Sequence, residues 1–219
     1  MTNNLLDMLQ GQLSEGMIDQ LSSQLGGADK QQTAQAASGI MSTLVSALAK
    51  NASSNEGANS LANALDNDHD GSVLDNVMDL LGGGGQAQPS RATNGAGILK
   101  HVLGNKQGGA IDMISKMSGL DSGNTGNLMT MLAPMVMGML GKQKKEQGLD
   151  VGGLASLLTG TVTQQKQNSN PLMNMATSFL DQDGDGSIVD DVAGMGMKIL
   201  GNLFKKSIEL ISIHFKGAA

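Results

Sequence analysis

The chain contains no cysteine, tryptophan or tyrosine and only three phenylalanines. Without cysteine it has no disulfide, no thiolate metal site and no cysteine nucleophile. With so few aromatic side chains, a hydrophobic core must be built from leucine, methionine, isoleucine, valine and alanine. The 16 methionines make such a core soft and adaptable.

Long apolar runs are also missing. The longest, LMTMLAPMVMGML at 128–140, is shorter than the roughly 20 residues that span a bilayer. The N-terminal stretch MTNNLLDMLQGQL has neither the basic start nor the continuous apolar segment of a secretory signal. We therefore expect no transmembrane segment and a cytoplasmic protein.

Acidic residues are concentrated in two similar stretches, LDNDHDGSVLDNV at 65–77 and LDQDGDGSIVDDV at 180–192. The formal net charge is -6, and nine of the 20 acidic residues lie in these stretches, so the rest of the chain carries a positive balance. Such concentration is typical of a cation site and not of a generally acidic surface.

The chain also repeats itself. The segment 17–50 aligns with 110–143, and the acidic stretches follow at a larger offset, so the second copy contains about 22 additional residues around 149–170. The glycine-rich polar stretch 83–97 is typical of a linker. These patterns predict a helical unit at 1–82 with an acidic loop at 66–77, a second unit at 98–204 with an acidic loop at 181–192, and an amphipathic tail at 205–219.

Hydrophobic periodicity in both copies is helical. Ile40, Leu44 and Leu48 fall on one helix face, and no sustained alternation indicates a strand. Asp29 and Asp150 stand where helix N-caps are expected. The predicted fold class is all-α, with two repeated small helical units that each contain an EF-hand-like DxDxDG loop between helices.

The order of these motifs resembles a known family. GADKQQTAQAASGIMSTLVSALAK, LDNDHDGSVLDNVMDLLGG, GILKHVLG, MSGLDSGNTGNLMTMLAPMVMGMLGK and LDQDGDGSIVDDVAGMGMKILGNLF follow one another as in the YidB-like bacterial family of unknown function. The resemblance covers residues 5 to 204. It implies an all-helical fold with a homeodomain-like arrangement and no established activity.

The acidic loops follow EF-hand logic, in which oxygen ligands at alternating positions converge on one cation. Aspartates occupy positions one, three and five, a glycine that can turn the chain stands at six, and a serine at seven can offer its carbonyl. The candidate calcium ligands are Asp66, Asp68, Asp70, Ser72 and Asp75 in the first loop and Asp181, Asp183, Asp185, Ser187, Asp190 and Asp191 in the second.

Both loops depart from this pattern at position twelve, where valine replaces the bidentate glutamate. We therefore expect weak calcium binding, with a dissociation constant of about 10 μM to 1 mM. The second loop should bind more tightly, because Gly184 replaces His69 at position four and Asp191 replaces Asn76 at position eleven.

A metal-free interpretation of the loops is the alternative. Asp, Asn and Gly are ordinary turn residues, and SVLD and SIVD each form a capping box that would start the next helix. Three uncompensated carboxylates within five residues repel one another, which favours a cation. Mg²⁺ is the weaker candidate because it retains its waters. The sequence thus predicts two Ca²⁺ sites.

Other features favour structural roles. The methionine stripe 129–139 is typical of a core, with a partner-binding groove as the alternative. The lysines of GKQKKEQG at 141–148 are expected at a solvated helix end. Three scattered histidines lack zinc spacing. No nucleophile, base and orienting group form a catalytic constellation.

These observations predict a calcium-binding structural or interaction protein without catalysis. A homeodomain-like nucleic-acid-binding protein is one alternative, but the acidic chain lacks a basic recognition helix. The other alternative is homo-oligomeric assembly, or binding of a protein partner, through the methionine-rich helix or the C-terminal tail, with metal-free capping loops.

Overall fold

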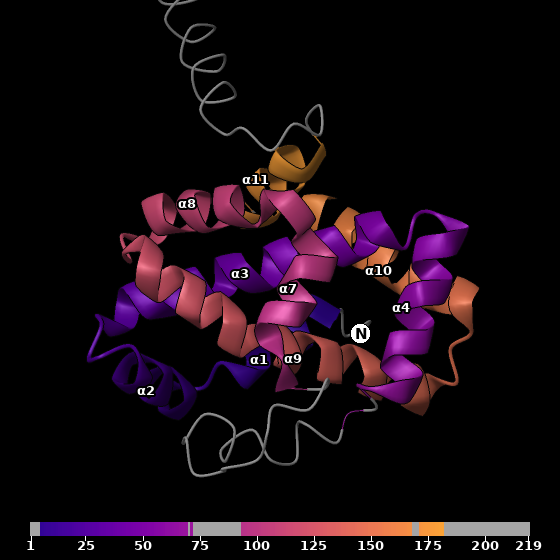
Figure 1. Ribbon diagram of the computed structural model, residues 1–219, viewed down its shortest axis with the longest axis horizontal. Helices are drawn as coiled ribbons and strands as arrows, with labels where there is room; N and C mark the ends of the chain where they lie inside the picture. The colour runs from indigo at the N-terminus through magenta and orange to yellow at the C-terminus, as the bar shows by residue number, and fades with distance from the viewer. Residues whose placement is uncertain (1–4, 70, 72–92, 168–170, 182–219) are drawn as a thin grey trace, which may run out of the picture. The chain divides into compact units, whose positions relative to one another are not determined.

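The computed structural model describes residues 5–69, 71, 93–167 and 171–181, which all belong to the unit Met1–Gly184. These residues form helices and no strand (Figure 1), so the predicted all-α class is confirmed. The first half contains α1 (Leu5–Gln12), α2 (Glu15–Gln24), α3 (Lys30–Asn51) and α4 (Asn55–Asn67). The second half contains α7 (Gly95–Leu103), the 3-10 helix η2 (Gly104–Lys106), α8 (Gln107–Ser118), α9 (Ser122–Gln147), α10 (Val151–Gln167) and α11 (Pro171–Asp181).

Helix α3 is the centre of the fold. It begins where the sequence predicted, because the Asp29 carboxylate accepts a hydrogen bond from the backbone N–H of Gln32 at 2.9 Å. Every other described α-helix contacts it, and Figure 1 shows it running between α8 and α9. All residues from 39 to 49 are buried. A helix that is buried on all sides needs apolar or small residues around its whole circumference.

Polar side chains in the middle of α3 are satisfied within the helix itself. The Ser42 hydroxyl donates to the Ser38 carbonyl at 3.0 Å, and the Thr43 hydroxyl donates to the Gly39 carbonyl at 2.8 Å. These hydroxyls can therefore be buried without the cost of an unpaired polar group. At Gly39, α3 packs against Ile114 of α8, and a Cβ atom there would lie at an ordinary contact distance of 3.6 Å from that side chain.

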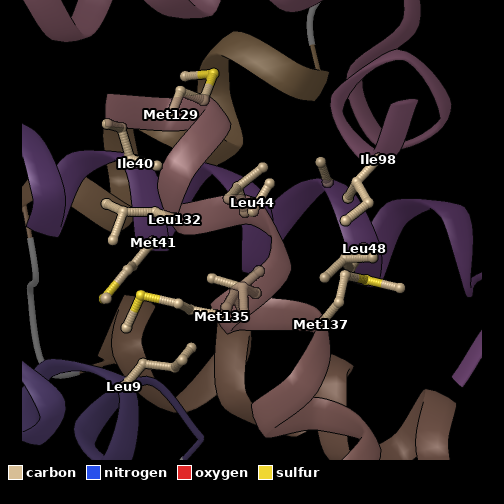
Figure 2. Close-up of a cluster of buried hydrophobic side chains, with 14 of the residues drawn as sticks. Leu9, Ile40, Met41, Leu44, Leu48, Ile98, Met129, Leu132, Met135 and Met137 are labelled. Carbon is tan, nitrogen blue, oxygen red and sulfur yellow. The ribbon is translucent and has the colours of Figure 1, made fainter. Parts of the chain in front are cut away.

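The methionine-rich stretch lies in α9 and faces the core. Met129, Met135 and Met137 are buried, and Figure 2 shows them among leucine and isoleucine side chains that include Leu44 of α3 and Ile98 of α7. The preferred core interpretation is thus confirmed. The alternative of a partner-binding groove formed by this stripe is wrong, because these side chains are covered by the protein's own helices.

Helix α9 contains Pro134 in its interior. Proline has no N–H, which leaves the carbonyl of Thr130 without its usual helical donor. The start of α7 lies against this carbonyl: a Cβ atom on Gly95 would stand only 1.9 Å from the Thr130 oxygen. The missing side chain at residue 95 is therefore what lets α7 pack closely on α9.

Helices of the two halves correspond to one another. At the offsets seen in the sequence, α1 to α4 match α7, α8, α9 and α11 in that order. Gly26 and Gly119, which align in the repeat, both have φ of 76° within two residues of the end of the second helix of their half. Asp29 and Asp121 cap the long helices, each accepting from a backbone N–H at 2.9 Å.

Helix α10 lies in the predicted additional segment and has no counterpart between α3 and α4. Asp150 caps its start, as expected, by accepting from the Gly153 N–H at 2.7 Å. One face of α10 is buried, through Leu154, Leu158 and Thr161. The insertion therefore adds to the core.

The last helix of each half packs on the long helix of the other half. Helix α4 packs against α9, and α11 packs against α3. Buried side chains of both halves form one continuous cluster. The two predicted helical units thus share a core, and most of the predicted linker 83–97 lies outside the described residues.

Replacing Gly95 with alanine should test the close approach of α7 and α9. The new methyl group would overlap the Thr130 carbonyl, so both backbones must shift. We expect Gly95→Ala to lower the free energy of unfolding by about 2 to 3 kcal/mol in urea titrations. Gly108→Ala is the matched control, because a Cβ atom at this exposed position of α8 meets nothing within 4 Å. An equal effect of the two changes would contradict the interpretation.

Candidate metal centre

The first acidic segment, residues 66–77, begins in the last turn of α4. Helix α4 ends at Asn67, and Asp68 follows as its C-cap. Gly71, at position six, has φ of 98°, a backbone angle that favours glycine and that the calcium-loop pattern predicts there. A Cβ atom on Gly71 would lie 3.0 Å from the Cβ of Lys142, so the segment lies directly against the end of α9.

Asp66 of this segment is not uncompensated. Its carboxylate forms an ion pair with the ammonium group of Lys144, with an Nζ to Oδ1 distance of 2.5 Å. The expectation of three unpaired carboxylates is therefore wrong for Asp66. The expectation of a solvated helix end is also wrong for Lys144, whose side chain is only 14 % exposed, whereas that of Lys142 is 51 % exposed.

His69, at position four of the same segment, is buried, with 4 % of its surface exposed. Its Nδ1 atom has no hydrogen-bond partner in the structure as described. Burial lowers the pKa of His69 below its ordinary value of 6.5, and the negative charge of Asp68 opposes this shift. His69 therefore lies in the protein interior, where burial favours its neutral form.

The second acidic segment, residues 181–192, begins at the end of α11, whose last residue is Asp181. Two ammonium groups lie at this helix end. Lys50, from the last turn of α3, and Lys106, from η2, both donate to the carbonyl of Leu180, the latter at 2.9 Å. The long helix of the first half thus places a lysine beside the second acidic segment, and the long helix of the second half places one beside the first.

Most predicted ligands lie outside the described residues. Among all the residues that the structure describes, no three or more His, Asp or Glu side chains are grouped closely enough to hold a metal ion. Only Asp66 and Asp68 of the ligand set have described side chains. The remaining members of the set are Asp70, Ser72, Asp75, Asp183, Asp185, Ser187, Asp190 and Asp191, together with the side chain of Asp181.

Sequence reasoning missed the three lysines, Lys144, Lys50 and Lys106. A lysine in the last turn of a helix is accounted for locally by the negative helix end, so it gives no sign of a distant partner. Lys144 and Asp66 are 78 residues apart. The only available signal was that α3 and α9, which correspond in the repeat, both have lysine in their last turn.

Both acidic segments start at helix C-termini. The carbonyl groups at such an end carry a partial negative charge, which stabilises cations and opposes carboxylates. Asp66, Asp68 and Asp181 therefore stand at the unfavourable end of their helices. Ammonium groups of lysine side chains lie beside both ends and supply compensating positive charge.

The fold and the acidic segments define an all-α protein with an internal repeat. The family described as bacterial protein of unknown function (DUF937) matches residues 7–143 and 145–212. The chain belongs to this family, which confirms the resemblance drawn from the order of motifs. Neither a curated protein nor a solved structure matches the chain. Of the helices described, none is long and apolar enough to cross a membrane.

The buried His69 predicts a loss of stability in mild acid. Its folded-state pKa is lowered, so the unfolded chain binds a proton more readily once the pH falls below 6.5. In excess chelator, the free energy of unfolding should be fully retained above about pH 7 and should fall as the pH drops through the folded-state pKa.

The measurement is denaturant unfolding across this pH range, with His69→Leu as the test variant. Leucine has a similar volume and no proton to bind, so the fall in stability below pH 6.5 should be smaller than in the original chain. His101→Leu is the control, because it removes an exposed histidine of α7. If His69→Leu retains the full pH dependence, another group is responsible.

Proposed function

We propose that the protein binds Ca²⁺ at both acidic segments and acts as a structural or interaction protein, without catalysis. The proposed ligands of the first site are Asp66, Asp68, Asp70, Ser72 and Asp75. Those of the second site are Asp181, Asp183, Asp185, Ser187, Asp190 and Asp191. This is a function that the family description leaves open.

One observation carries the proposal: both DxDxDG motifs start at the C-terminal ends of corresponding helices. Helices α4 and α11 occupy equivalent places in the repeat, and position one of each motif lies in or at the end of the last turn. Carboxylates at a helix C-terminus add to its negative charge. A divalent cation would neutralise this accumulated charge in both copies.

The metal-free alternative accounts less well for this position. Aspartate stabilises a helix when it caps the N-terminus, as Asp29 and Asp121 do in this fold. Capping boxes at 72–75 and 187–190 would explain the serines but not the preceding aspartates. The positive φ of Gly71 at position six further supports a loop that turns around an ion.

Binding in this place would have a structural consequence. The first segment contacts the end of α9 through Gly71, so a cation that fixes this segment would support a contact between the two halves. Hard oxygen ligands and a flexible loop suit Ca²⁺ better than Mg²⁺. Because both loops lack the closing glutamate, affinity should be in the weak range given above.

Nucleic-acid binding, assembly through the tail and the cellular location stay predictions from the sequence. A net charge of -6 opposes the nucleic-acid alternative, since phosphate binding requires clustered positive charge. Assembly through the tail 205–219 concerns residues outside those described. The cytoplasmic location is likewise an expectation from sequence alone.

Calcium should raise the melting temperature of the protein. An ion that binds only the folded state adds about 2.7 kcal/mol per site at a hundred times its dissociation constant. In calorimetric titration of chelator-treated protein, Asp181→Ala should remove the tighter phase, and Asp66→Ala should remove the weaker one.

Asp112→Ala is the control for these titrations, because it removes an exposed carboxylate from α8. It should leave both phases unchanged. Identical melting curves in excess chelator and in about 10 mM Ca²⁺, a saturating concentration for weak sites, would rule out calcium binding. Loss of the tighter phase in Asp66→Ala would reverse the assignment of the two sites.

A further inference from the structure

Lys144 and Asp66 connect the ends of two helices from different halves of the chain. Lys144 lies in the last turn of α9, and Asp66 lies in the last turn of α4. Their ammonium and carboxylate groups are 2.5 Å apart. The lysine side chain is mostly buried, whereas that of the aspartate is 59 % exposed. The ammonium group therefore approaches the aspartate from the protein side, and solvent can still reach the carboxylate.

Two helix C-termini benefit from this one positive charge. The ammonium group belongs to the last turn of α9 and lies on a carboxylate in the last turn of α4. Both ends carry partial negative charge from their terminal carbonyls. The charge of Lys144 thus stabilises the C-terminus of α4 in the way that a bound cation would.

The paired carboxylate is also position one of the proposed calcium loop. An ion that uses Asp66 as a ligand must displace the ammonium group of Lys144 or share the carboxylate with it. A mostly buried lysine that loses its partner is left poorly solvated, which opposes ion binding. The nearby positive charge also repels a divalent cation directly.

We propose that Lys144 sets the calcium affinity of the first acidic segment by competing with the ion for Asp66. This inference rests on the calcium binding proposed above and adds the residue that controls it. Ca²⁺ binding then releases Lys144 from Asp66, so the ion breaks this ion pair between the two halves. The protein in low calcium is held at this junction by its own lysine.

The first test is calcium calorimetry on the full chain carrying Asp181→Ala, so that only the first segment titrates. In that background, Lys144→Met and Lys144→Gln should each lower the dissociation constant about tenfold, because the competing charge is gone. Lys144→Arg should leave it within about twofold. Lys116→Met, which removes an exposed lysine from α8, controls for the change in net charge.

Lys144→Met and Lys144→Gln differ in packing but share the loss of charge, so one of them suffices if the other does not fold. Equal calcium affinity in these variants, in Lys116→Met and in the parent would overturn the role of Lys144 while leaving calcium binding intact. Absence of binding in every variant, including the chain without Asp181→Ala, would instead remove the proposed function and this inference with it.

Amine labelling followed by mass spectrometry gives a second readout in the unaltered protein. Acylation of the Lys144 ammonium should increase severalfold on addition of Ca²⁺, since the ion frees it from Asp66. Labelling of Lys116 should stay constant. If calorimetry shows binding to the first segment but Lys144 labelling does not change, Ca²⁺ does not displace the lysine, and the inference is wrong.

Discussion

Burial of α3 by all the other described helices is the constraint on which the fold depends. A helix that is covered on every side has no face for charged residues, and none occurs in α3 between Lys30 and Lys50. The hydroxyl groups of Ser42 and Thr43 donate to carbonyls of the preceding turn, so they are buried with partners. Because helices of both halves need this surface, neither half completes its core without the other.

The crosswise packing of α4 on α9 and of α11 on α3 follows from the same constraint. Each half ends by covering the long helix of the opposite half. Each acidic segment therefore starts next to a lysine of the opposite half. This lysine is Lys144 for the first segment and Lys50 for the second. An internal repeat has thus become an arrangement in which each copy supplies positive charge to the other.

This arrangement explains how carboxylates can stand at the ends of α4 and α11. A helix C-terminus by itself opposes negative side chains, and the effect amounts to about 0.3 to 1 kcal/mol for an exposed charge. Ammonium groups offset that repulsion in the structure, and a divalent cation would offset it more strongly. The lysine contacts and the proposed calcium binding would thus be two solutions to one electrostatic problem, and they would compete at Asp66.

The sequence by itself determined the helical class, the repeat, the caps at Asp29 and Asp150 and the inserted α10, because periodicity, capping and repeat offsets are local properties. It also placed the methionine stripe in the core, and it located the acidic motifs and the turn at Gly71. The whole ligand set stays a prediction, since all of its side chains except those of Asp66 and Asp68 lie outside the described residues.

Only the tertiary structure decided which long helix each half would cover and which lysine would meet Asp66. Lys142, Lys144 and Lys145 are equivalent in sequence, but Lys144 is the one that lies on the carboxylate of α4. The burial of His69 and the contact of Gly95 with Thr130 likewise depend on helices far apart in the chain. Such pairings follow from how two helix surfaces meet, and helical periodicity specifies the face of a helix but not its partner.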